Sequence, residues 1–218
     1  MLVALLLFAA SLPPGQTPAL AVAVDTTRLV PGFMNQQFAW GTLVLQDGRR
    51  LQGYLPTATT ALSQVVAYYP QPPDAKPARR PKLLLVEKVR WLRVRDHYAE
   101  LLPLGKDVEA QLAVRRQAGA VELFVLPAAE ASPVTSFLGA TPVLAQPAAS
   151  PDGLARASWY LRRPGGPPHL ITPQAFATQV AAFLADDKAL AAKVAAGAAG
   201  YRFADLESIV QQYNRHAQ

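Results

Sequence analysis

The sequence of 218 residues contains no cysteine. This absence excludes disulfide bonds, thiolate metal sites and cysteine nucleophiles. The sequence also lacks an apolar run that approaches the roughly 20 residues of a membrane-spanning helix. Charged residues make up only 17% of the chain and hydrophobic residues 51%, a balance typical of a folded core and not of a disordered chain.

The positive charge is concentrated in one segment. The formal net charge is +6, and residues 76–95 hold eight basic residues but only one acid, Glu87. The rest of the chain is close to neutral, which disfavours a protein that is basic over its whole surface. The candidate anion-binding residues within this segment are Arg79, Arg80, Lys82, Arg90, Arg93 and Arg95.

Three interpretations of this basic segment stay open. Its cations can be a solvated surface that protects sheet edges from aggregation. They can bind an anionic glycan or lipid of the cell envelope. With the nearby aromatic residues Trp91, Tyr68 and Tyr69, they can also stack on nucleic acid, which is the least favoured of the three.

Residues 1–23 are predicted to be a signal peptide. Leu2 to Ala10 form an apolar run, and Pro13-Pro14-Gly15 ends any helix that begins there. The small residues up to Ala21 and Ala23 fit cleavage by signal peptidase, although no basic residue precedes the apolar run. We therefore expect a periplasmic or secreted protein.

The remaining chain divides into an irregular lead-in (24–37), a β-rich region (38–171) and a helical subdomain (173–218). Asp47-Gly48 predicts a two-residue hairpin turn. Residues 70–81 hold five prolines and are predicted to be an exposed loop. Residues 127–157, rich in alanine and proline, are predicted to be a flexible loop.

The C-terminal residues have the periodicity of helices. Phe176, Val180, Phe183 and Leu184 share one helix face, and Asp186 is predicted to cap a second helix. The predicted fold class is α+β, with an antiparallel curved sheet or partial β-barrel followed by a small C-terminal helical subdomain.

Signatures of catalysis are absent from the sequence. It contains neither the Gly-x-Ser-x-Gly string of a serine hydrolase nor a phosphate-binding glycine loop. The histidines His97, His169 and His216 are isolated from one another, whereas a zinc site usually needs a close pair of ligands. We therefore assign no catalytic, cofactor-binding or metal-binding residue and expect no cofactor.

Acidic residues offer only a weak case for catalysis. A glycosidase needs two carboxylates that flank the scissile bond. Glu100, Glu109 and Glu122 are scattered, and the sequence leaves open whether two of them converge. The adjacent pair Asp186-Asp187 is interpreted as helix capping, because carboxylates accept hydrogen bonds from the free N–H groups of a helix start.

Several strings of residues resemble a family of exported proteins common in Bacteroidetes. They are residues 41–48 with 51–55, residues 119–124 with 159–161, and residues 170–176 with 205–214. The resemblance implies an envelope or secreted location and an α+β layout, and it supplies no catalytic residue.

These observations favour a non-enzymatic cell-envelope or periplasmic interaction module. One alternative is an exported hydrolase that uses carboxylate catalysis. A second is anion or nucleic-acid binding through residues 76–95. The expected partner is an envelope protein or an anionic glycan or lipid, with nucleic acid disfavoured and no transmembrane segment expected after residue 23.

Export gives the first testable prediction. The intact mass of the protein recovered from its host is expected to lack the first 21 or 23 residues, with the protein outside the cytoplasm. An uncleaved cytoplasmic protein would contradict the predicted export.

Overall fold

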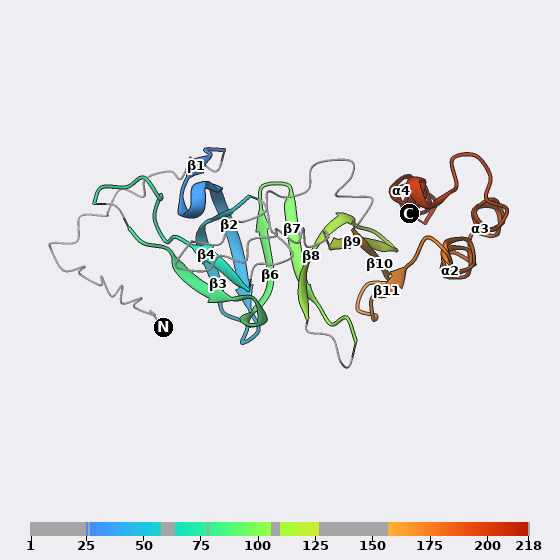
Figure 1. Ribbon diagram of the computed structural model, residues 1–218, viewed down its shortest axis with the longest axis horizontal. Helices are drawn as coiled ribbons and strands as arrows, with labels where there is room; N and C mark the ends of the chain where they lie inside the picture. Colours follow the sequence, from blue (N-terminus) through green and yellow to red (C-terminus); the bar gives the residue numbers. More distant parts are fainter. Residues whose placement is uncertain are drawn as a thin grey trace, which may run out of the picture.

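The computed structural model describes residue 25 and residues 27–57, 64–77, 79–105, 110–126 and 157–217. Within these residues an antiparallel sheet is followed by three helices (Figure 1). The sheet is curved but not closed, which confirms the predicted α+β class. The predicted signal peptide and residues 127–156 of the predicted loop lie outside the described residues.

The main sheet has the strand order β1-β2-β6-β7-β8-β9-β10-β11, and β3 pairs with the other side of β2. A separate hairpin joins β4 to β5. The strands are β1 (Val30–Pro31), β2 (Gln37–Leu45), β3 (Arg50–Pro56), β4 (Val65–Tyr68), β5 (Lys82–Leu85), β6 (Val89–Val94), β7 (His97–Leu102), β8 (Gln111–Gln117), β9 (Glu122–Leu126), β10 (Ser158–Arg162) and β11 (His169–Ile171).

The helices are α2 (Phe176–Phe183), α3 (Lys188–Ala195) and α4 (Leu206–His216). Three short 3₁₀ helices accompany them: η1 (Phe33–Asn35), η2 (Val86–Lys88) and η3 (Phe203–Asp205). The predicted lead-in thus contains β1 and η1, and the predicted proline-rich loop ends directly before β5.

A turn at Asp47-Gly48 joins β2 to β3, but it is longer than the predicted two residues, because β2 ends at Leu45 and β3 begins at Arg50. Gly48 has a φ of 84°, a conformation that glycine adopts without steric cost. The Asp47 carboxylate accepts a hydrogen bond from the backbone N–H of Arg49 at 3.0 Å. Local turn chemistry therefore sets the register of this hairpin.

The β4–β5 hairpin covers the inner face of the first half of the sheet. Tyr54 on β3 and Tyr69 exchange backbone hydrogen bonds of 2.8 and 3.0 Å, which hold the hairpin against β3. Gly53 permits this approach, because a Cβ there would lie 2.3 Å from the Tyr69 carbonyl oxygen. Val66 and Leu84 then join the core that lies behind β2, β6 and β7.

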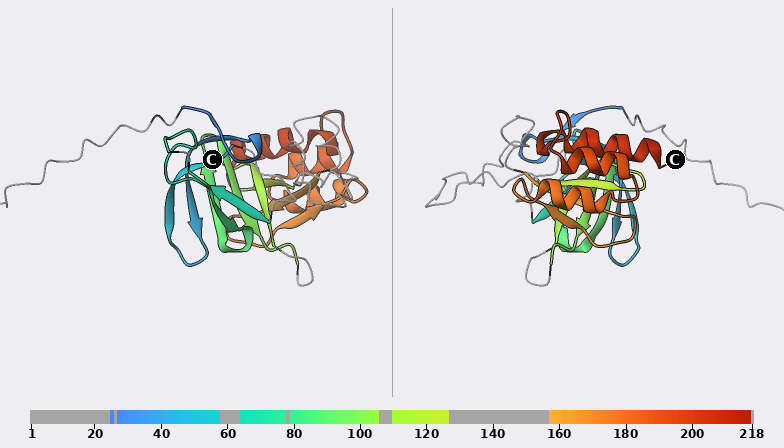
Figure 2. Two further views of the ribbon diagram at one scale, coloured as in Figure 1. Left: turned by 60° about the vertical axis from the view of Figure 1, so that its left-hand side comes forward. Right: turned by 90° about the vertical axis from the view of Figure 1, so that its right-hand side faces the viewer.

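The helices cover the other half of the same face, beside β9, β10 and β11 (Figure 2). Leu123 on β9 and Leu161 on β10 point toward the helices and pack in one cluster with Val180 and Leu184. Phe183 is only partly buried, whereas Leu184 is fully buried. Sheet and helices therefore share a hydrophobic core.

The predicted cap of the second helix is wrong by one residue. Asp187 caps α3, because its carboxylate accepts a hydrogen bond from the Leu190 N–H at 3.0 Å. Asp186 instead accepts a hydrogen bond of 2.6 Å from the Tyr213 hydroxyl and pairs with Arg163. This tertiary contact, which joins α4 to the start of α3, is invisible in the local sequence.

Asn214 fixes α4 to the turn between β8 and β9. Its side-chain oxygen accepts a hydrogen bond from the Val121 N–H at 2.9 Å, and its amide donates to the Val121 carbonyl at 2.7 Å. The side chain is buried, and a Cβ at Gly119 would lie 2.5 Å from its Cγ. The turn and the helix therefore fit each other closely.

Asn214→Ala is expected to destabilise the protein by about 1–3 kcal/mol, because it leaves both backbone groups of Val121 buried without these partners. Denaturant unfolding measures this change. Gln211→Ala, at an exposed position on the same helix, is the control. A change within about 0.5 kcal/mol for Asn214→Ala would show that the clamp contributes little.

Candidate anion-binding surface

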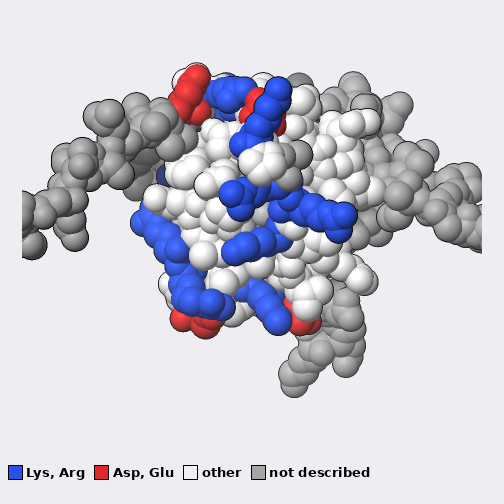
Figure 3. Space-filling view, turned by 90° about the vertical axis from the view of Figure 1, so that its left-hand side faces the viewer, with Lys and Arg blue, Asp and Glu red and all other residues white. Residues whose placement is uncertain are grey.

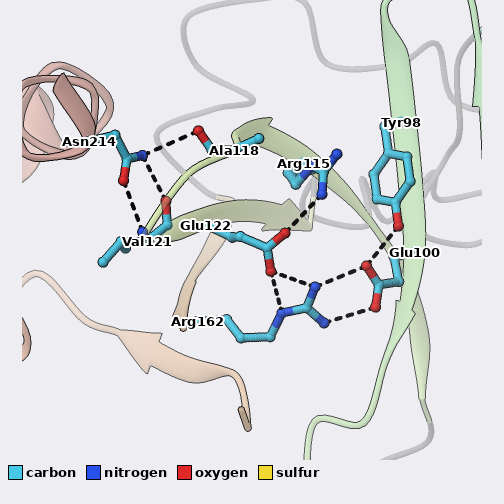
Figure 4. Close-up of polar contacts among 8 residues, drawn as sticks. All are labelled: Tyr98, Glu100, Arg115, Ala118, Val121, Glu122, Arg162 and Asn214. Atoms are coloured by element: carbon cyan, nitrogen blue, oxygen red, sulfur yellow. Dashed lines mark hydrogen bonds and ion pairs between the residues drawn. The ribbon is translucent and has the colours of Figure 1, made fainter. Parts of the chain in front are cut away.

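Two of the three scattered glutamates meet on one arginine (Figure 4). The Arg162 guanidinium on β10 donates to both carboxylate oxygens of Glu100 on β7, at 2.8 and 3.0 Å. It also donates through Nε to Glu122 on β9 at 2.8 Å. The third candidate, Glu109, lies outside the described residues.

Two further side chains complete this cluster, which we name the Arg162 network. Arg115 on β8 donates to the free oxygen of Glu122 at 2.8 Å, and the Tyr98 hydroxyl donates to Glu100 at 2.9 Å. The Arg115 guanidinium also lies 3.9 Å from the centre of the Tyr98 ring. Two positive and two negative charges balance, and every carboxylate oxygen in the network accepts a hydrogen bond.

Burial and hydrogen bonding oppose each other at Glu100. Burial acts to raise its pKa, but the hydrogen bonds from Arg162 and Tyr98 outweigh burial and hold the pKa below its usual value. Burial, with the nearby charge of Glu100, raises the pKa of Tyr98 to about 12. Glu100 therefore stays ionised and Tyr98 stays neutral at physiological pH.

These properties favour a structural role for the network. A carboxylic acid that donates a proton in catalysis needs a raised pKa, as in glycosidases. The pKa of Glu100 is lowered, and both of its oxygens are engaged. A groove of about 480 Å³ between β11 and α2 is lined by His169, Leu170 and Phe183 among others, and none of its described lining residues carries a carboxylate.

The basic segment follows a path over the outside of the fold. Arg79 and Arg80 lie in the chain before β5, and Lys82 is the first residue of β5. Arg90 and Arg93 lie on β6, and Arg95 lies in the turn between β6 and β7. All six candidate side chains are exposed, and so are those of Lys76 and Lys88.

The basic residues of the segment differ from most other arginines in that they form no ion pair among the described residues. None of the eight basic residues of the segment pairs with a carboxylate in the described part of the chain. Six arginines outside the segment do form such pairs: Arg28, Arg49, Arg115, Arg116, Arg162 and Arg163. The charge of the segment is therefore open to an external anion.

Strand pairing adds a cation that the sequence interpretation missed. The register aligns Arg50 on β3 with Val44 on β2, and Val44 with Trp91 on β6. Arg50 therefore lies in the same row as Trp91, on the outer face of the sheet. Arg93, two residues further along β6, lies on the same face, and both arginines are exposed. The hairpin at Asp47-Gly48 was the signal for this proximity, because it brings β3 beside β2.

Lys and Arg side chains gather on the side of the molecule that carries β3 and β4 (Figure 3). They extend across the middle of this face, and Asp and Glu appear only near its margins. We name the eight basic residues of 76–95 together with Arg50 the basic surface. Its members lie on both sides of this end of the sheet: Lys82 lies on the β4–β5 hairpin, which covers the inner face, and Arg50 and Arg93 lie on the outer face.

The three histidines lie on three different elements. His97 begins β7, His169 begins β11, and His216 ends α4, where its Nδ1 lies 3.0 Å from Asp187. Over the described ranges, no three His, Cys, Asp or Glu side chains cluster in a way that could hold a metal ion. The helices within these ranges include none long and apolar enough to cross a membrane.

The chain matches no protein-family model, no curated protein and no solved structure in comparisons with known proteins. The resemblance to exported proteins of Bacteroidetes thus stays a prediction.

The Arg162 network predicts a specific dependence of stability on pH. The pKa of Glu100 is lowered in the folded state, so its contribution to stability is present above the unfolded pKa of about 4.3. It is lost as the pH falls through the lower, folded pKa. Glu100→Gln is therefore expected to destabilise the protein by about 1–3 kcal/mol at pH 7 and by progressively less in acid.

Denaturant unfolding of both proteins from pH 7 downward measures this difference. Glu87→Gln, at an exposed residue without an ion pair among the described residues, is the control and should show no such trend. A difference between Glu100→Gln and the original protein that is constant with pH would contradict an ionised Glu100.

Proposed function

We propose that this chain is an exported, non-enzymatic interaction module that binds an anionic component of the cell envelope through its basic surface. The observation that carries the proposal is the set of eight exposed cations in residues 76–95 that pair with none of the described carboxylates. An exposed cation without a partner keeps its full attraction for an anion, which accelerates and strengthens binding.

The placement of acids supports this assignment. Glu87 is the only acid within the segment, although Glu87, Asp47 and Asp74 lie close in the chain to parts of the basic surface. Asp47 and Asp74 are already paired with Arg49 and Arg28. These two acids therefore neutralise other arginines. Glu87 and Asp96, which directly follows Arg95, offset at most two of the eight positive charges of the segment.

The non-enzymatic part of the proposal rests on the Arg162 network and the groove. Of the two glutamates that converge, Glu100 has a pKa held below its usual value by hydrogen bonds from Arg162 and Tyr98, so it lacks the raised pKa of a general acid. The carboxylate of Glu122 is engaged by Arg115 and Arg162. The groove beside α2 has no carboxylate among its described lining residues. These facts support binding over the alternative of carboxylate hydrolysis.

The predicted signal peptide implies a location in the cell envelope, and this location determines which anions the protein can meet. An exported protein meets anionic glycans and lipid headgroups, whereas nucleic acid is the abundant polyanion of the cytoplasm. The proposal therefore names an envelope anion.

Three substitutions test the basic surface. Arg79→Gln, Arg80→Gln and Lys82→Gln together are expected to weaken binding to vesicles of phosphatidylglycerol roughly 100-fold, at about 1 kcal/mol for each basic residue near an anionic surface. Co-sedimentation at several salt concentrations measures the binding, and the salt dependence should become shallower.

The matched control removes the same charge elsewhere. Lys188→Gln, Lys193→Gln and Arg215→Gln replace three exposed cations of α3 and α4. An equal loss of binding in both triple variants would mean that net charge alone drives binding and would contradict a localised surface. Both triples should keep the unfolding midpoint of the original protein, because the six residues are exposed and form no ion pair among the described residues.

A further inference from the structure

Two leucines of β5 are exposed beside the basic residues. Leu83 is 52% exposed and Leu85 is 44% exposed. The residue between them, Leu84, packs into the core behind the sheet, because successive side chains of a strand point to opposite faces. Leu83 and Leu85 therefore project together from the outer face of the β4–β5 hairpin.

The apolar character of this outer face continues onto β4. The register places Val65, which is partly buried, directly opposite Leu85, and Ala67 opposite Leu83. Ala67 is itself buried with Tyr54 and Tyr69, so the exposed part of this face consists of Leu83, Leu85 and part of Val65. Among the described strands, β5 pairs with β4 alone, so β5 forms an edge of the hairpin. A small apolar face thus lies at the border of the fold.

Cations lie at both ends of this strand. Arg79, Arg80 and Lys82 precede the two leucines, and Lys88 follows them within three residues of Leu85. Lys82, the first residue of the strand, is exposed but shares the register face of Leu84. All four basic side chains are exposed. Apolar side chains next to clustered cations are the combination that binds an anionic membrane surface, where neither signal alone gives stable attachment.

We propose that β5 docks the protein onto an anionic bilayer, with Leu83 and Leu85 entering the boundary of the acyl chains and the flanking cations contacting the headgroups. This inference rests on the proposed function and names the anion as a lipid surface. It adds an apolar contribution, which a soluble anionic glycan would not use.

The geometry favours a bilayer over two other occupants. A second copy of the chain would bring two strongly basic segments together, and like charges would repel. A peptide strand added to the edge of β5 would pair its backbone, yet the leucine side chains on the sheet face would stay largely in water. A bilayer covers the face and neutralises the cations at the same time.

The direct test labels the strand itself. Because the chain has no cysteine, Leu83→Cys provides a single site for an environment-sensitive fluorophore. Vesicles of phosphatidylglycerol and phosphatidylcholine in equal parts are expected to shift its emission to the blue, as the label enters an apolar layer. Leu170→Cys, on β11 at a similarly exposed leucine, should show no shift. Emission unchanged at position 83 while the protein is bound to vesicles would overturn the proposal.

A second pair of variants separates lipid insertion from charge. Leu83→Thr with Leu85→Thr is expected to weaken vesicle binding about tenfold or more, while binding to the soluble anionic glycan heparin is unchanged. Threonine preserves the preference for a strand. Leu29→Thr with Leu170→Thr removes two other exposed leucines and should bind vesicles as the original protein does.

The outcomes distinguish the two proposals. If the leucine pair leaves vesicle binding unchanged while the cation triple abolishes it, the basic surface stands and the docking role of β5 fails. If the original protein binds neither the vesicles nor heparin, the proposed function itself fails. Capture of an acidic peptide in place of vesicles, lost in the leucine pair, would assign β5 to a protein partner and overturn bilayer docking.

Discussion

The Arg162 guanidinium connects strands that are not neighbours in the sheet. Strands β7 and β10 are separated by β8 and β9, which corresponds to about 14 Å across a flat sheet. Arg162 nevertheless contacts Glu100 at 2.8 Å, and a sheet that curls toward the face carrying both side chains shortens the span between them. On the same face, Leu102, Phe124 and Tyr160 form a small core beneath this curl. The ion network and the curvature thus depend on each other.

The curvature determines what each face of the sheet can do. With one face of β7–β10 closed by the network and its small core, the opposite face of β9–β11 is left for α2, α3 and α4. At the other end of the sheet, the β4–β5 hairpin covers that same opposite face. The outer face of β3, β2 and β6 is therefore the part that presents exposed Arg50 and Arg93. Arrangement of the core leaves the basic residues on the outside.

Local patterns in the sequence predicted the elements better than their contacts. Alternation and turn chemistry gave the hairpin at Asp47-Gly48, and the spacing of Phe176, Val180 and Leu184 gave the first C-terminal helix. The Arg162 network was not predictable, because Arg162 and Glu100 are 62 residues apart and meet only through strand order and curvature. Capping by Asp187 in place of Asp186 was missed for a similar reason.

Basic residues that only protect sheet edges would explain part of the basic surface. Lys82 lies on the edge strand β5, where a cation discourages pairing with another chain. Arg93, however, lies in the part of β6 that pairs with β2 on one side and β7 on the other. A strand paired on both sides has no edge to protect, so edge protection does not explain Arg93.

The exposed leucines of β5 are a second feature that edge protection does not explain. An edge strand designed only against aggregation would carry charges in place of large apolar side chains, yet β5 exposes Leu83 and Leu85. Their exposure is unfavourable in water, and it is relieved when an apolar layer covers them. An anionic surface with an apolar interior would cover the leucines and pair with the cations at the same time. Edge protection explains only the cations of β5, whereas the proposed binding would explain the exposed leucines as well.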